Sequence, residues 1–399
     1  MDKPFYELDP DGDVILVLRY PNAPFANWDE WAEDFNEPLP NHRNVWPLPV
    51  SESPSPVAGP EPEDGPPAPV ADDLEAEPEF VVGASFEPNV ANSETLDADH
   101  SKRSEIRFRL SSTHLISASS FFKRALGGPW KEGCSVTPDC CRYIHAEEWD
   151  PNALLILMRI IHGRNWSVPS SVNLEMLAKI AVLVDYYQCH EAVYMFSELW
   201  IKALEGQVPA ECSRELILWL VVSRVFGRAD MFTAITRTAM RESRRPLPTL
   251  GLPALESVVG GQSWNRSYVR GLIRSTEAID EAREKSVNRI IIALHCLLER
   301  FRNRQAGCSF ECSSILLGAL EIEMHTAGIL EPQPKPPYLG YSFSVVIEMV
   351  RSFRSPKWST PQWRNSFSHA CSLTQLIQPM IEGVEESMGG LMLRNFPNT

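Results

Sequence analysis

Fifteen residues in the first third of the chain read Phe108-Arg-Leu-Ser-Ser-Thr-His-Leu-Ile-Ser-Ala-Ser-Ser-Phe-Phe122. The first three alternate in polarity, as in a half-buried strand. The serine pair at 111 and 112 can cap a helix, and apolar residues then recur at helical spacing from Leu115 to Leu126. The sequence therefore predicts a strand followed directly by one helix, which ends at Gly127.

Patterns on either side of this stretch predict the other elements of an α+β fold. Residues 13–18 form a short apolar run after an Asp-Pro-Asp-Gly turn and are expected to be a buried strand. Residues 142–145 alternate in polarity and predict another strand, and Asp150 followed by Pro151 is a typical helix start. On apolar spacing we expect helices at residues 151–161, 174–188 and 193–200, a pair within 215–241 broken near Gly227, and further helices at 270–305, 341–353 and 373–388.

The residues around Phe108 resemble the central segment of a BTB/POZ domain, which is a protein-interaction fold. Six residues fall in register with the family pattern: Phe108, Leu110, Leu115, Ser119, Phe121 and Phe122. Ser111 and His114 depart from the common pattern, and the resulting Ser-Ser-x-x-Leu version is similar to that of fungal members of the family. The resemblance covers residues 5–20 and 104–204. It implies short strands packed with helices, followed here by a mainly helical C-terminal region.

Composition divides the chain into four parts. Residues 1–20 are expected to supply the first strand of the BTB-like domain, residues 104–204 the remainder of that domain, and residues 205–399 the helical C-terminal region. Residues 21–103 form an acidic, proline-rich insert, in which residues 44–101 hold thirteen acids, eleven prolines and no Lys or Arg. Because this composition buries too little apolar surface to offset chain entropy, the insert is expected to be largely disordered. Its acids account for most of the net charge of −15.

Four aromatic residues near the start of the insert are candidates for partner binding: Phe25, Trp28, Trp31 and Phe35. They are spaced by three, three and four residues, with Asp and Glu between them, which is typical of a short amphipathic helix. Such a helix could dock on its own domain, or it could bind another protein as a docking peptide. The sequence leaves both interpretations open.

Three cysteines and a histidine in the C-terminal region provide the side chains that a zinc site requires. Cys308 and Cys312 lie near an expected helix start, and His369 and Cys371 follow about 57 residues later, just before another helix. Three thiolates and one imidazole would form a closed tetrahedral set, which is the composition of a structural zinc site. The C-terminal halves of fungal BTB chains resemble this one in carrying such residues. The alternative is that all four are ordinary core residues.

Several other classes of function find no support in the sequence. It contains no glycine-rich phosphate loop and no hydrolase or metalloprotease motif, so no enzyme activity is expected. Arginines cluster at 237–245 and at 300–304, but residues 102–399 carry a net charge of only +5, so we interpret both clusters as solvated helix faces and do not expect nucleic acid as a partner. No apolar run approaches the length of a membrane span and no apolar leader precedes the first strand. With nine cysteines, these features predict an intracellular protein, cytoplasmic or nuclear.

The resemblance to BTB/POZ domains implies a binding module. We expect an adaptor that recruits a protein partner through the BTB-like domain, and the partner that many family members use is a cullin-type ubiquitin-ligase scaffold. Two alternatives stay open: a nuclear transcription regulator that uses the acidic-aromatic segment, and a zinc-dependent enzyme, which would need an open metal position beside a general base. Because few residues precede the first strand, a strand-exchanged dimer of the usual BTB kind is not expected. The oligomeric state is otherwise left open.

Overall fold

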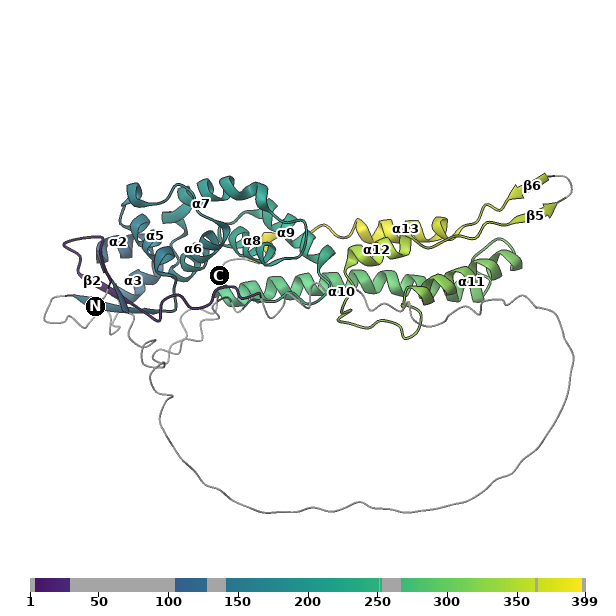
Figure 1. Cartoon of the computed structure of the whole chain (residues 1–399), viewed down its shortest axis with the longest axis horizontal. Coiled ribbons are helices and arrows are strands. Elements are labelled where there is room, and N and C mark those ends of the chain that lie inside the picture. The colour runs from purple at the N-terminus through teal and green to yellow at the C-terminus, as the bar shows by residue number, and fades with distance from the viewer. Residues whose placement is uncertain are drawn as a thin grey trace, which may run out of the picture.

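A computed structural model describes residues 4–28, 105–127, 141–250, 252, 267–362 and 365–396, with the side chains of all of these except residues 267–273 and 359–368. The predicted insert beyond residue 28, with Trp31 and Phe35, therefore lies outside the described residues. The described chain has a mixed α+β structure, as predicted, with a small sheet and many helices (Figure 1).

A four-stranded sheet belongs to the N-terminal half of the molecule. Its strands are β1 (Phe5–Glu7), β2 (Val14–Arg19), β3 (Glu105–Leu110) and β4 (Arg142–Glu147), in the order β1-β3-β2-β4. Strand β2 is antiparallel to β3 and parallel to β4, and all three were predicted from their apolar patterns. The sequence pattern does not predict β1, which pairs in parallel with β3 at the edge of the sheet.

The helix predicted after Ser111 is two helices in the structure, α2 (Ser112–Ala118) and α3 (Ser120–Gly127). The prediction of one continuous helix is wrong because Ser119 has an extended backbone, with φ −141° and ψ 122°. The Ser119 hydroxyl accepts a hydrogen bond from the backbone N–H of Phe122 and donates one to the carbonyl of Tyr187. This buried serine therefore starts α3 and joins it to the end of α6.

Helix α5 (Pro151–Ile161) begins at Pro151, as predicted, and is followed by the buried His162. Nε2 of His162 accepts a hydrogen bond from the backbone N–H of Ser111 at 2.9 Å, while Nδ1 donates one to the carbonyl of Met158 at 2.8 Å. Burial lowers the pKa of His162. The neutral imidazole thus links the end of α5 to the start of α2.

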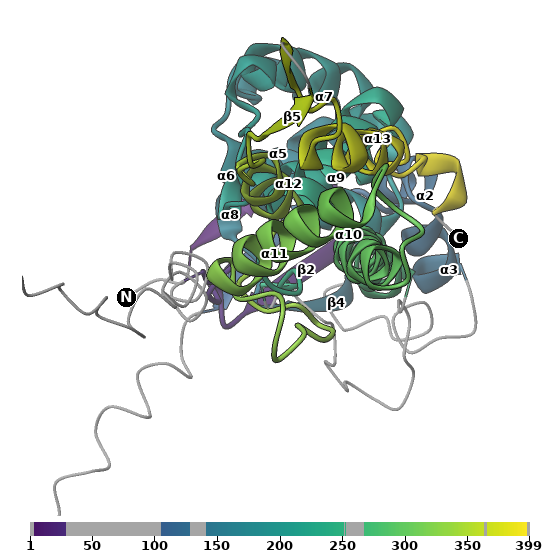
Figure 2. The same cartoon turned by 90° about the vertical axis from the view of Figure 1, so that its right-hand side faces the viewer.

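The remaining helices extend from the sheet through the C-terminal half. They are α6 (Leu174–Tyr187), α7 (His190–Leu204), α8 (Arg214–Val225), α9 (Ala229–Glu242), α10 (Ser267–Arg302), α11 (Phe310–Thr326), α12 (Phe343–Arg351) and α13 (Leu373–Glu385), with short 3-10 turns η2 (Asn165–Ser167), η3 (Glu205–Gln207) and η4 (Leu393–Asn395). The predicted helix pair is confirmed as α8 and α9, which separate at Gly227. Figures 1 and 2 show α10 alongside α11, α12 and α13. An antiparallel hairpin of β5 (Ser359–Gln362) and β6 (Asn365–Ser368) extends beyond these helices (Figure 1).

The hydrophobic core crosses the predicted boundary at residue 204 without interruption. Most buried apolar residues of the sheet and of the helices form one cluster that runs from Leu8 to Met388 along the sequence, while Ile15, Val17 and Cys141 form a separate small one. Helix α8 lies within this cluster, and each of its residues from Leu216 to Val225 is buried. Because α8 also packs against α6, the C-terminal half continues the core of the N-terminal half.

Candidate metal centre

The four predicted metal-ligating residues lie at two junctions between elements of the C-terminal half. Cys308 is in the turn between α10 and α11, and Cys312 is in the first turn of α11. His369 follows β6 directly, and Cys371 lies shortly before α13. Ser309 caps the first turn of α11 and Ser372 caps the first turn of α13, which fixes the backbone next to Cys312 and Cys371.

The side chains of these four residues meet, as the sequence predicts. One ligand atom from each of Cys308, Cys312, His369 and Cys371 lies within 4.8 Å of those of the other three. Nε2 of His369 is 3.3 Å from Sγ of Cys308 and 3.1 Å from Sγ of Cys312. Four ligands that each lie about 2.0–2.3 Å from one zinc ion are roughly 3–4 Å from one another. The geometry therefore allows this group to hold a metal ion.

Two further residues set the positions of these ligands. Gly307 precedes Cys308 with φ +87°, and a Cβ at this position would lie 2.7 Å from the hydroxyl oxygen of Ser313. The ring of Trp358 stacks on His369 with the ring centroids 4.3 Å apart, and its carbonyl accepts a hydrogen bond from the His369 backbone N–H. Neither residue belongs to a pattern that the sequence predicts, although a glycine directly before a candidate ligand is a signal for a tight turn.

The thiol of Cys371 lies close enough to those of Cys308 and Cys312 for them to affect its ionisation. Desolvation, together with hydrogen bonds and charge from Cys308 and Cys312, raises the pKa of the Cys371 thiol to about 11. A divalent cation at the centre of the set would oppose this effect, because it stabilises the thiolate that ligates it. Cys312 is buried whereas Cys308 is exposed, so solvent reaches the centre from the Cys308 side.

The four predicted partner-binding aromatic residues do not form one site in the described structure. Phe25 and Trp28 are half-buried against the core, while Trp31 and Phe35 lie outside the described residues. Residues 21–28 contain no helical turn, so the described part of the predicted amphipathic helix is not a helix. Of the two interpretations that the sequence leaves open, packing on the same chain is the arrangement observed for Phe25 and Trp28.

Arginines of the two basic clusters make contacts within the chain. Arg237 donates hydrogen bonds to the backbone carbonyl of Gly389, and Arg241 pairs with Glu385 at 3.6 Å. Arg302 pairs with two glutamates, one on its own helix and one on α11. These contacts join the three arginines to groups of their own chain.

Comparison with known proteins identifies no relative of this chain. No protein-family model matches it, and neither a curated protein nor a solved structure matches it. Among the helices in the described part of the chain, none combines the length and the apolarity that crossing a membrane requires. The function therefore has to be inferred from the residues and the geometry of the chain itself.

Proposed function

We propose that the chain is a protein-interaction adaptor, with a BTB/POZ-like N-terminal half and a C-terminal half that is held by a structural zinc ion. The residues around Phe108 support the first part. The sheet, in which β2 is antiparallel to β3 and parallel to β4 and has helices packed against it, is compatible with the α+β fold that these residues imply. The three cysteines and the histidine that converge in the C-terminal half support the second part.

Zinc is the metal that this donor set favours. Thiolate and imidazole ligands suit zinc, whereas calcium and magnesium prefer oxygen ligands. Four protein ligands fill a tetrahedral site and leave no position for water or substrate, which argues against the alternative of a zinc-dependent enzyme. The role of the metal is then to join the turn between α10 and α11 to the base of the β5–β6 hairpin.

The observation that carries the adaptor proposal is an exposed apolar face on α7. Tyr194, Met195 and Leu199 are 60%, 73% and 50% exposed, although all three have large apolar side chains. Met195 and Leu199 are four positions apart on one helix face, and Tyr194 is exposed on the neighbouring face. Single exposed apolar residues are ordinary, but a contiguous group is typical of a protein-binding surface. We assign this face to a cullin-type scaffold, which is the partner that the BTB/POZ resemblance implies.

Calorimetric titration of the full chain with a purified cullin N-terminal domain tests this assignment. The double variant Met195→Asp, Leu199→Asp should lose binding, because it places two charges on the apolar face. Ile322→Asp is the matched control, since Ile322 is 60% exposed but lies on α11. Absence of binding by the unmodified chain, or equal binding by the α7 double variant, would refute the cullin assignment. Co-purification of the chain with chromatin proteins from cells would favour the transcription-regulator alternative.

A further inference from the structure

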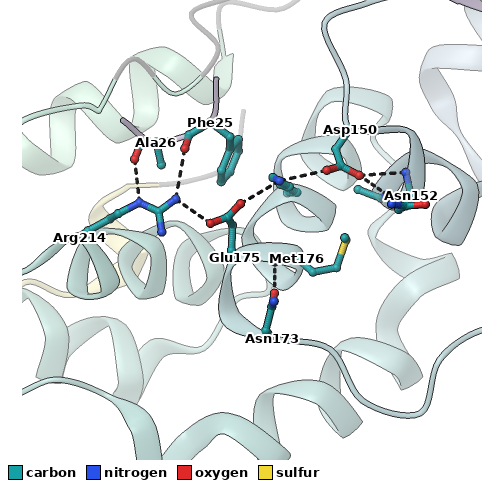
Figure 3. Close-up of polar contacts among 10 residues, drawn as sticks. Phe25, Ala26, Asp150, Asn152, Asn173, Glu175, Met176 and Arg214 are labelled. Atoms are coloured by element: carbon teal, nitrogen blue, oxygen red, sulfur yellow. Dashed lines mark hydrogen bonds and ion pairs between the residues drawn. The ribbon is translucent and has the colours of Figure 1, made fainter. Parts of the chain in front are cut away.

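Residues 21–28, called the strap below, leave β2 and cross α6 and the first turn of α8 without regular structure. Arg214, the first residue of α8, donates a hydrogen bond from Nε to the carbonyl of Ala26 at 2.8 Å and one from a terminal nitrogen to the carbonyl of Phe25 at 3.2 Å (Figure 3). Nζ of Lys179 on α6 lies 5.6 Å from the centroid of the Phe25 ring, which is a cation–π distance. Two cations therefore bind two consecutive carbonyls and one aromatic ring of the strap.

These two cations are held in place by groups outside the strap. The guanidinium of Arg214 is 2.9 Å from the carboxylate of Glu175, and Nζ of Lys179 is 2.9 Å from the same carboxylate. Lys179 also pairs with Asp150 at 3.0 Å, and Asp150 in turn caps α5 (Figure 3). The positions of both cations thus depend on α5, α6 and α8 and do not require the strap.

A cavity lies between the strap and the helices beneath it. Phe25, Glu148 and Lys179 line it, together with Trp149, Val182 and Leu183. The last three residues are only 6%, 2% and 1% exposed and form an apolar floor. An apolar floor with a few charged groups at the rim is typical of a small binding groove, and the Phe25 side chain leaves part of it unfilled.

The strap itself is held by little buried surface. Ala26 is buried, but Phe25 and Trp28 are only half-buried. Tyr20, Asn22 and Ala26 have φ values of +49°, +65° and +51°, in the left-handed region that asparagine tolerates and that strains the other two residues. Displacement of the strap would relieve the strain at Ala26, and a competing peptide does not have to break a large packed interface.

We propose that this groove is a peptide-binding site, that Phe25 and Ala26 occupy it in cis, and that an extended partner segment with an aromatic residue followed by a small residue displaces them. Two consecutive carbonyls of that segment bind Arg214, its aromatic ring lies against Lys179, and its small side chain takes the buried position of Ala26. A tryptophan in place of phenylalanine would use the unfilled part of the cavity. Only the biological role of this site rests on the proposed adaptor function. Peptide binding itself involves neither the metal centre nor α7.

A fluorescein-labelled synthetic peptide with the sequence of residues 20–28 is the probe, and fluorescence anisotropy measures its binding to the full chain. The unmodified chain should bind it weakly, because the strap competes in cis at an effective concentration in the millimolar range. The chain variant Phe25→Ala should bind it at least about tenfold more tightly, because its own strap competes less well. A peptide with tryptophan at the phenylalanine position should bind more tightly still, and one with alanine there should not bind.

Chain variants identify the groove as the site. Adding Arg214→Gln to Phe25→Ala should abolish the gain in affinity, whereas adding Arg228→Gln should preserve it, because Arg228 pairs with Glu198 away from the groove. Equal peptide affinities of the unmodified chain and of folded Phe25→Ala would overturn the proposal.

A measurement on the unmodified chain covers the case in which Phe25→Ala does not fold. The backbone N–H of Asn22 donates to the carbonyl of Trp149 at 3.2 Å, and its hydrogen exchange should become several-fold faster when the tryptophan peptide is in excess. The exchange of Leu16 in β2 should stay constant. Unchanged exchange of Asn22 at high peptide concentration would show that the strap is not displaced.

Discussion

Cys312→Ser tests the metal centre most directly, because Cys312 is the ligand with no exposed surface. Without metal, the substitution buries a hydroxyl in place of a thiol, which costs about 1–3 kcal/mol. With zinc, the variant also loses the stabilisation that comes from binding to the folded state, which is about 2.7 kcal/mol when free zinc is a hundred times the Kd. For a unit of the size of the C-terminal half, residues 205–399, this zinc-dependent part corresponds to a shift in Tm of about 5–10 °C.

Thermal unfolding followed by circular dichroism, at a buffered free zinc concentration and again with a chelator, measures the two contributions separately. The unmodified chain should lose the zinc-dependent part on chelation, and Cys312→Ser should show no response to zinc. Cys189→Ser is the matched control: Cys189 is also fully buried, so this variant should be destabilised but keep its response to zinc. Elemental analysis should find one zinc ion per chain. An unmodified chain that contains no zinc and has the same Tm with and without chelator would refute the metal centre.

Three further outcomes are expected elsewhere in the chain. Burial lowers the pKa of His162, so the folded state favours the neutral imidazole. The stability that this neutral imidazole contributes is complete above the unfolded-state pKa of about 6.5 and is lost as the pH falls below that value toward the folded-state pKa. His162→Phe should therefore weaken the fall in the free energy of unfolding between about pH 8 and pH 5. At the higher pH it should cost about 1–3 kcal/mol, because the Ser111 N–H loses its acceptor. Urea unfolding at a series of pH values measures both effects, and a free energy of unfolding that depends on pH as steeply as that of the unmodified chain would contradict this prediction. Gly390→Ala should lower the free energy of unfolding by more than about 1 kcal/mol, since Gly390 has φ +85° and a Cβ there would collide with the carbonyl oxygen of Thr233, whereas Gly389→Ala, with no atom near the new Cβ, should have a much smaller effect. Deletion of residues 51–94 should leave Tm unchanged, because their composition provides little apolar surface to bury; a loss of several degrees would show that they pack on the fold.

The spacing of apolar residues predicts a helix or a strand where the buried residues of that element recur at regular intervals. Helix α5 and strand β3 follow their predicted positions because their apolar residues face one core, and β2 follows its predicted position because its apolar run is buried on both faces. The break at Ser119 could not be predicted in this way, since it depends on a hydrogen bond from the serine hydroxyl to the distant carbonyl of Tyr187. Periodicity reports which residues are buried, but it does not report where a tertiary contact interrupts the helix.

Short elements escape sequence analysis because they bury too little. Strand β1 has three residues and none of them is buried, so its pairing with β3 leaves no alternating pattern to detect. The hairpin of β5 and β6 is held at its base by the stacking of Trp358 on His369. Neither contact leaves a periodic signal in the sequence.

The aromatic spacing of Phe25 and Trp28 has a cause other than the predicted helix. Both side chains contact the core from an irregular segment, and Ala26 between them has a left-handed backbone. Helical spacing is thus compatible with any path that brings the side chains onto one surface, and residues 29–35 complete the predicted pattern outside the described part of the chain. The metal-ligand set, in contrast, could be predicted because its residue types are chemically specific and do not depend on the path of the chain.

The candidate metal centre lies beside an exposed turn at the edge of the hydrophobic core. Residues 302–305 and 307–311, which form the turn into α11, are exposed, whereas the residues of α8 from Leu216 to Val225 are all buried. The exposed turn adds little apolar packing of its own, so bonds from four side chains to one ion would strengthen its junction with the base of the hairpin, and the binding free energy would add directly to the stability of that region. Loss of the ion should then loosen this region while the continuous core around α8 remains intact. The apolar face of α7 and the groove under the strap rest on that core, so we expect the proposed partner binding and the proposed metal binding to be separable.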